Sequence, residues 1–213
     1  MTSSPATPAT SNSHGPQGVP DAGDGAGAGA GRAVAQVAVF AALIAALGLM
    51  GAIPVPGLVP ITAQTLGVML AGAVLGPWRG GAAVVLLLGL VAVGLPVLSG
   101  GRGGLGVFVG PSVGYLIGWI AGAVVVGLIV HGVRASRTVR PTWLKSILGS
   151  AVGGILVIYA FGIPVQAMVT GLGLGPTALT SLAFLPGDLI KVALAAVVTM
   201  ALWRAYPRAF RRV

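Results

Sequence analysis

Long stretches without a charged side chain set the main constraint on how this sequence can fold. The uncharged intervals contain 46 residues after Arg32, 22 after Arg79, 31 after Arg102 and 42 after Lys145. One helical crossing of a bilayer needs about 20 consecutive apolar residues. Charged residues make up 7% of the chain and the mean hydropathy is +1.00, whereas soluble domains are about 25% charged. The sequence therefore predicts an all-α membrane protein.

The lengths of these intervals predict six membrane-spanning helices. The first interval is long enough for two spans, and three prolines within residues 54–60 prevent a continuous helix through it. The second and third intervals hold one span each, and the span of the third begins after Pro111. The fourth holds the fifth span. The last span must begin near Pro186, because residues 192–203 reach only about 18 Å as a helix.

The basic residues favour one orientation of these six spans. With the N-terminus inside, ten of the twelve basic residues fall on the inner side, Arg102 falls outside and Lys191 lies in a span. Cytoplasmic loops of membrane proteins carry such an excess of Lys and Arg. Trp78, Trp143 and Trp203 also fall at the inner boundary, where indole rings favour the headgroup level. We therefore expect a multi-pass protein of the cell membrane with both termini in the cytoplasm.

The composition divides the chain into three regions. Residues 1–31 are rich in Ser, Thr, Pro, Ala and Gly, and we expect them to form a disordered tail, because they cannot bury enough apolar surface to order. About thirty polar residues precede the first apolar stretch, which is not the pattern of a cleaved signal peptide. Residues 32–205 form the expected six-span domain, and residues 206–213 form a basic cytoplasmic end.

The residue inventory excludes several classes of function. The chain has no Cys, and Asp188 is its only carboxylate residue after Asp24, which argues against thiolate metal sites and paired-carboxylate hydrolases. The histidines, His14 and His131, lie in the tail and at the inner end of the fourth span, so no catalytic triad is expected with Asp188. The chain also lacks a G-x-x-x-x-G-K-[ST] phosphate loop. We expect no enzyme, no cofactor and no metal, and an external energy source for any uphill transport.

Three ionisable residues are not explained by orientation in the membrane: Arg102, Asp188 and Lys191. Asp188 and Lys191 share a helix face at i, i+3 and can form a structural ion pair. Arg102 can be a solvated loop charge. The alternative is a ligand site, because ionisable groups within spans are costly and usually functional. All three are expected at the outer face, where two cations and one anion suit a small carboxylate. The net charge of +9 comes mostly from the ten basic residues that orient the protein in the membrane, and the long uncharged stretches leave little soluble surface. Nucleic acid is therefore not an expected partner.

Small residues mark a loop and two helix surfaces. Residues 100–106 contain G-x-G-x-x-G, but no strand precedes it, so we interpret it as a loop with positive φ angles and not as a dinucleotide motif. Glycines recur every fourth residue from Gly110 to Gly122, which predicts close helix packing. Tyr115 and Trp119 lie beside them and can wall a pocket. Ala38 and Ala42 form a smooth stripe, facing either lipid or another membrane subunit.

Several segments, in this order, resemble the BioY family, the biotin-binding S subunits of energy-coupling factor (ECF) transporters. They are AVFAALIA at 38–45, VPITAQTLG at 59–67, LGPWRG at 75–80, GGRGG at 100–104, GPSVGYLIG at 110–118 and FLPGDLIK at 184–191. At 112–113 the chain has Ser-Val where the family more often has Thr-Gly. The resemblance extends from about residue 33 to residue 203.

The resemblance implies the six-helix S-component fold and biotin capture from the outside. It implies that Arg102 and Lys191 hold the biotin carboxylate, and that Asp188 accepts ligand N–H groups or orients Lys191. Thr62 and Gln64 would close over the ligand from a loop, and Tyr115 would belong to the wall. The implied partners are a transmembrane coupling subunit, docked on the stripe of Ala38 and Ala42, and two ATPase subunits. A stand-alone carrier for biotin or another carboxylate vitamin is the alternative.

Overall fold

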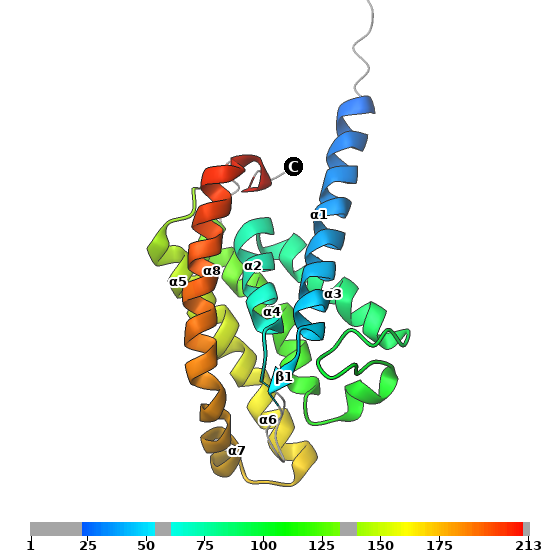
Figure 1. The fold of residues 1–213 in the computed structure, drawn as a ribbon, viewed down its shortest axis with the longest axis vertical. Helices are drawn as coiled ribbons and strands as arrows, with labels where there is room; N and C mark the ends of the chain where they lie inside the picture. The colour runs from blue at the N-terminus through cyan, green and yellow to red at the C-terminus, as the bar shows by residue number, and fades with distance from the viewer. Residues whose placement is uncertain (1–22, 54–60, 133–139, 211–213) are drawn as a thin grey trace, which may run out of the picture.

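The computed structural model describes residues 23–53, 61–132 and 140–210, which form a bundle of helices with one pair of two-residue strands (Figure 1). Short 3-10 or π segments are labelled η. In chain order the elements are α1 (Gly23–Leu49), β1 (Ala52–Ile53), β2 (Ile61–Thr62), α2 (Gln64–Leu75), α3 (Pro77–Ala92), η1 (Leu105–Val109), α4 (Val113–His131), α5 (Trp143–Ala151), η2 (Val152–Val157), α6 (Ile158–Thr170), α7 (Leu174–Ser181), η3 (Leu182–Phe184), α8 (Leu185–Ala205) and η4 (Pro207–Phe210).

Four helical stretches of the described chain are long and apolar enough to cross a bilayer. They are Gly29–Leu49, Val113–His131, Trp143–Thr170 and Leu174–Ala205. The last two are composite, because η2 joins α5 to α6 and η3 joins α7 to α8. The helices α2 and α3 are also apolar but shorter. The described chain therefore contains six helical stretches, in agreement with the number expected, and α8 begins beside Pro186 as expected.

The helix α1 begins earlier than the composition indicates. Its first residue is Gly23, so residues 23–31 of the expected disordered tail are helical. Once the apolar part of α1 has formed, each added residue gains one backbone hydrogen bond without a new nucleation cost. Residues 1–22 lie outside the described residues. Residues 54–60, with the expected proline break, also lie outside them, between the paired strands β1 and β2.

The second and third helices meet at a sharp corner. Gly76 separates α2 from α3 with a φ angle of 84°, a conformation that L side chains rarely adopt, and Pro77 begins α3. A Cβ atom at Gly127 of α4 would lie 2.5 Å from the Cα of Pro77, so only glycine permits this approach. The corner is therefore held by backbone contact with α4.

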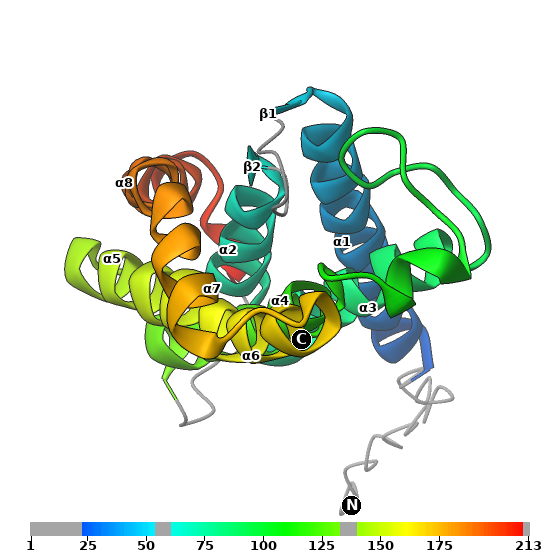
Figure 2. The same ribbon diagram turned by 90° about the horizontal axis from the view of Figure 1, so that it is seen from below.

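The helix α4 lies at the centre of the bundle, among α2, α3, α5 and α6 (Figure 2). In its most apolar stretch 56% of the residues are buried, against 17% in α1. The glycine ladder of α4 packs against the stretch from η2 to α6: Gly114 faces Val165, Gly118 faces Ile158 and Gly122 faces Gly153. This confirms the packing role expected for these three glycines. Gly110 lies before α4 and takes no part.

Both ends of the described chain lie at the same end of the bundle, where α1 extends beyond the other helices (Figure 1). After α8 the short η4 folds back, and Phe210 is fully buried. Its ring stacks on His131 with centroids 6.4 Å apart and meets Trp203 edge-on at 5.4 Å. The basic C-terminal end thus contributes one apolar side chain to the core, which its charge did not predict.

The close contact between Gly122 and Gly153 should be necessary for the stability of the bundle. A Cβ atom at Gly122 would lie 2.6 Å from the carbonyl oxygen of Gly153. Gly122→Leu should therefore destabilise the protein by about 2 kcal/mol and lower its unfolding temperature in detergent by about 4–8 °C. Gly89→Leu is the matched control, because Gly89 is exposed on α3 with open space around it. Equal unfolding temperatures for the two variants would contradict the packing role.

Candidate functional site

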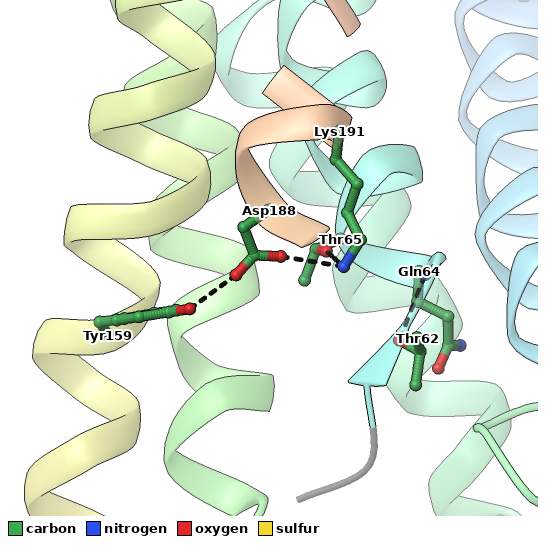
Figure 3. A network of polar contacts seen from close by, with 6 residues as sticks. All are labelled: Thr62, Gln64, Thr65, Tyr159, Asp188 and Lys191. Carbon is green, nitrogen blue, oxygen red and sulfur yellow. Dashed lines mark hydrogen bonds and ion pairs between the residues drawn. The ribbon is translucent and has the colours of Figure 1, made fainter. Parts of the chain in front are cut away.

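A buried ion pair lies in the first turns of α8. The Nζ atom of Lys191 donates to Oδ1 of Asp188 at 2.9 Å, across the i, i+3 spacing, and the two side chains are 13% and 6% exposed. Tyr159 of α6 donates its hydroxyl to Oδ2 of Asp188 at 2.7 Å. Lys191 also donates to the hydroxyl of Thr65 on α2 at 3.0 Å (Figure 3). The pair therefore ties three helices together, with a hydrogen bond to Tyr159 on the Asp188 side and one to Thr65 on the Lys191 side.

A cavity that is partly open to solvent adjoins this ion pair. Its lining combines polar groups from α2 and α8 with aromatic rings from α4, α6 and η3: Thr62, Thr65, Tyr115, Trp119, Gly154, Ile158, Tyr159, Phe184, Asp188 and Lys191. The ring of Tyr115 meets those of Tyr159 and Phe184 edge-on, with centroids 6.3 and 6.4 Å apart. Apolar walls with a few placed polar groups are typical of small-molecule sites.

A π-helical turn forms part of the cavity wall. The segment η2 contains Gly154, which lines the cavity, and it ends two residues before Tyr159. A π turn inserts an extra residue into a helix and so changes the direction of the side chains that follow; such turns are frequent at functional sites. We attribute the inward direction of Tyr159 to this turn.

Arg102 lies in a neighbouring cavity. Its Nε atom donates to the carbonyl oxygen of Ser99 at 3.1 Å, and its Nη1 atom donates to the hydroxyl of Ser112 at 3.4 Å. This second cavity shares Thr62, Tyr115 and Trp119 with the first. The structure therefore brings Asp188 and Lys191 into contact and places Arg102 beyond a shared wall. Within the described residues Arg102 has no carboxylate partner.

The residues Thr62 and Gln64 differ from the expected loop that closes over a ligand. Thr62 lies in strand β2 and lines both cavities. Gln64 is the first residue of α2 and is 1% exposed, with its side-chain amide hydrogen-bonded to backbone groups. Both residues therefore belong to regular secondary structure and not to a loop. The side chain of Gln64 is held by its hydrogen bonds and is not free to move over a ligand in this conformation.

Tyr115 is held at its hydroxyl group by two buried polar residues. It donates to Oε1 of Gln166 at 2.8 Å and lies 3.1 Å from the hydroxyl of Ser181. These contacts leave its ring as the shared wall of the two cavities, which agrees with the wall position expected for it.

Sequence reasoning did not identify four of the residues that complete this site: Thr65, Ser112, Tyr159 and Gln166. One signal was available, because Tyr159 and Gln166 are uncommon polar side chains in the 42-residue uncharged interval. A polar group buried in a span is expected to have a partner. Which residue is the partner depends on how each helix is rotated about its axis, and the sequence does not give that rotation.

Groups for catalysis or metal binding do not gather at this site. Among the described residues no three His, Cys, Asp or Glu side chains lie together. His131 lies at the end of α4, stacked on Phe210 and 2.9 Å from the carbonyl oxygen of Ala73. Asp188 lies in the first turn of α8, at the other end of the bundle.

The stripe on α1 is exposed within the part of the chain that the structure describes. Ala38 and Ala42 are exposed, whereas Ala41 and Ile44 face the core and are buried. The structure therefore places the expected docking residues on an open helix face.

Comparison with known proteins was made against families, curated sequences and solved structures. The model of the BioY family matches residues 22–208. The chain is 49% identical to a biotin transporter BioY of Rhodobacter capsulatus, over 84% of this chain and 96% of that protein. It is 44% identical to a probable biotin transporter BioY of Bacillus subtilis, over 79% and 89% of the two chains. It is also similar to a crystal structure of the S-component for biotin from an ECF-type ABC transporter, with a TM-score of 0.76, 30% identity, and coverage of 86% and 97%.

The ion pair between Asp188 and Lys191 should contribute to the stability of the protein. Asp188→Asn leaves the ammonium group of Lys191 without a carboxylate at a site where it is only 13% exposed. We expect a loss of about 3 kcal/mol in the free energy of unfolding, because an unpaired buried charge is strongly destabilising. The double variant Asp188→Asn, Lys191→Met removes both charges and should recover about half of that loss. Thermal unfolding of the ligand-free proteins in detergent measures the loss in the single variant and the recovery in the double variant. An unchanged unfolding temperature for Asp188→Asn would show that the pair does not stabilise the fold.

Proposed function

The chain belongs to the BioY family, and from this premise we propose that it takes up biotin as the membrane-embedded S subunit of an ECF transporter. The observation that carries this proposal is the pair of cavities beside α2, one with the ion pair of Asp188 and Lys191 and the other with Arg102. Titration of the purified chain in detergent with biotin, and in parallel with thiamine, riboflavin and lipoate, tests it. Only biotin should bind tightly.

The chemistry of the site fits biotin. Biotin is a monoanion with a polar ring and an apolar body, so its site needs a cation, polar groups and apolar walls. The pair of Asp188 and Lys191 is neutral as a unit, and Arg102 adds one positive charge that no described carboxylate compensates. The guanidinium group binds carboxylates in a bidentate geometry. Arg102 therefore holds the biotin carboxylate.

Lys191 contributes a second cation, and Asp188 has two possible functions. The distance of 2.9 Å between Lys191 and Asp188 supports the function of orienting the lysine, because the Lys191 ammonium group also contacts Thr65. In that position Lys191 presents its remaining N–H group to the cavity. The Asp188 oxygen that accepts from Tyr159 can receive an N–H group of the ligand in addition. Tyr115 and Trp119 pack against the apolar body of the ligand.

The protein crosses the membrane six times, with both termini in the cytoplasm. The corner between α2 and α3 lies next to His131, at the end of the bundle that carries η4 and the start of α1. The charge count assigns ten of the twelve basic residues of the sequence to the side of the N-terminus, as expected for the cytoplasmic side. Of these, Arg134, Arg137, Arg211 and Arg212 lie outside the described residues. The ion pair then lies toward the outer side.

The partners are a transmembrane coupling subunit and two ATPase subunits. The chain has no phosphate-binding loop of its own. The exposed stripe of Ala38 and Ala42 on α1 is smooth enough for another membrane helix to approach closely. The alternative is a stand-alone carrier that uses the same site, and uptake of biotin in a host without any coupling subunit would favour it.

The two cations of the site should be required for binding. Arg102→Ala or Lys191→Ala should weaken biotin binding more than tenfold, about 1.4 kcal/mol or more, while expression is unchanged. Isothermal titration of the purified variants measures this. Lys145→Ala is the matched control, because Lys145 is an exposed cation at the start of α5. Wild-type affinity in both site variants would remove the assignment of Arg102 and Lys191.

The stripe on α1 should be required for assembly and not for ligand binding. Ala38→Trp and Ala42→Trp should prevent co-purification of the coupling subunit, because a bulky side chain separates the two helices. Biotin affinity of the isolated chain should not change. Val85→Trp is the control, since Val85 is an exposed apolar residue of a different helix, α3. Recovery of the full complex with both alanine variants would place the docking surface elsewhere.

A further inference from the structure

A single buried amide connects α2 to the segment that carries Arg102. The side chain of Gln64 donates through Nε2 to the carbonyl oxygen of Val97 at 3.2 Å and to that of Ile44 at 3.4 Å. Its Oε1 atom accepts from the backbone N–H of Ser99 at 3.2 Å. These three bonds use both donors and one acceptor position of a side chain that is 1% exposed. Its partners come from α1 and from the loop after α3.

The two loop residues held by Gln64 form the base of a tight turn. Leu98, between them, pairs with Arg102 through two backbone hydrogen bonds of 3.1 and 3.2 Å. Gly100 and Gly101 close the turn with φ angles of 75° and 71°, which only glycine adopts readily. The guanidinium Nε of Arg102 then donates back to the carbonyl oxygen of Ser99. The position of the Arg102 side chain therefore depends on the two residues that the amide of Gln64 holds.

The neighbours of Gln64 hold the other half of the site. Thr65 accepts a hydrogen bond from Lys191, and Thr62 lines both cavities. Figure 3 shows Thr62, Gln64 and Thr65 at the start of α2, with Thr65 toward Lys191 and the amide of Gln64 pointing away from the ion pair. Residues 62–65 thus contact Lys191 on one side and the turn of Arg102 on the other.

We propose that Gln64 is a positioning residue, which fixes Arg102 relative to Lys191 and so makes a free carboxylate on the ligand a requirement for tight binding. This inference rests on the proposed function, in which Arg102 holds the carboxylate. Gln64 does not contact the ligand. It acts through the turn of residues 97–102, whose distance from the ion pair decides where the anionic end of a bound molecule must lie.

A second residue reports on the same contact. A Cβ atom at Gly48 of α1 would overlap the amide of Gln64 and lie 2.6 Å from the carbonyl oxygen of Val97. Gly48→Ala therefore disturbs the contact while the glutamine is retained. Gln64→Met keeps the approximate size of the side chain and removes its three hydrogen bonds. Gln36→Met is the matched control, because Gln36 is a partly buried glutamine of α1 that accepts from Arg79, away from the turn.

The decisive measurement compares the affinities of biotin and biotin methyl ester. The wild-type chain should prefer biotin by about tenfold or more, as expected for a hydrogen bond to a charged group. Gln64→Met and Gly48→Ala should reduce this preference at least about threefold, and Gln36→Met should not. In the double variant Gln64→Met, Arg102→Ala, the preference should equal that of Arg102→Ala alone, because non-additive effects identify residues that act as one unit. The proposal would be overturned if Gln64→Met and Arg102→Ala reduced the preference for biotin over its methyl ester additively. It would also be overturned if Gln64→Met left this preference unchanged.

A ligand-free measurement separates this inference from the proposed function. The chain has no cysteine, so spin labels can be placed at Leu105→Cys and Met50→Cys, which are 72% and 78% exposed in the chain as it stands. The distance distribution between the labels should broaden in Gln64→Met and stay narrow in Gln36→Met. A narrow distribution in Gln64→Met would overturn the positioning role even if biotin binds. If the wild-type chain does not bind biotin, the proposed function and the requirement for a ligand carboxylate are both wrong. A broader distance distribution between the labels in Gln64→Met would then still support Gln64 as the residue that holds the turn.

Discussion

The ion pair between Asp188 and Lys191 is the interaction on which the candidate site depends. Asp188 is the only carboxylate residue after Asp24, so Lys191 has one available counter-charge within the spans. Pairing lowers the cost of both charges, and each partner gains one further hydrogen bond, Asp188 from Tyr159 and Lys191 to Thr65. Because these partners lie on α6 and α2, the pair also fixes the first turns of α8 against two other helices. Neutrality of the pair leaves Arg102 as the net charge of the site.

Small residues allow the helices to approach closely enough to support this arrangement. In a bilayer the hydrophobic effect does not drive helices together, so close packing and hydrogen bonds must do so. The contacts of Gly118 with Ile158 and of Gly122 with Gly153 place α4 directly against η2 and α6. The same approach brings Tyr115 within edge-on distance of Tyr159. The aromatic wall of the cavity therefore depends on the glycine packing beside it on the same helices.

The parts of the site differ in how far they follow from local sequence. The contact between Asp188 and Lys191 could be predicted, because an i, i+3 spacing places two side chains on one helix face wherever the helix lies. The contact of Asp188 with Tyr159 could not, since 29 residues separate them and the π turn of η2 sets the direction of the tyrosine. Gln64 was expected over the ligand. Its amide is instead committed to three backbone groups, two of them on a loop more than 30 residues away.

From the sequence alone it followed that the chain is a helical membrane protein, that six helical stretches are expected, and that Asp188 and Lys191 can pair. Those properties depend on apolar length, charge placement and spacing within one helix, all of which are local. The position of Arg102 and Lys191 at two adjoining cavities, with Tyr115 in the wall between them, is known only from the three-dimensional arrangement. That outcome depends on the rotation and closeness of helices, which packing between distant residues sets and no single segment encodes.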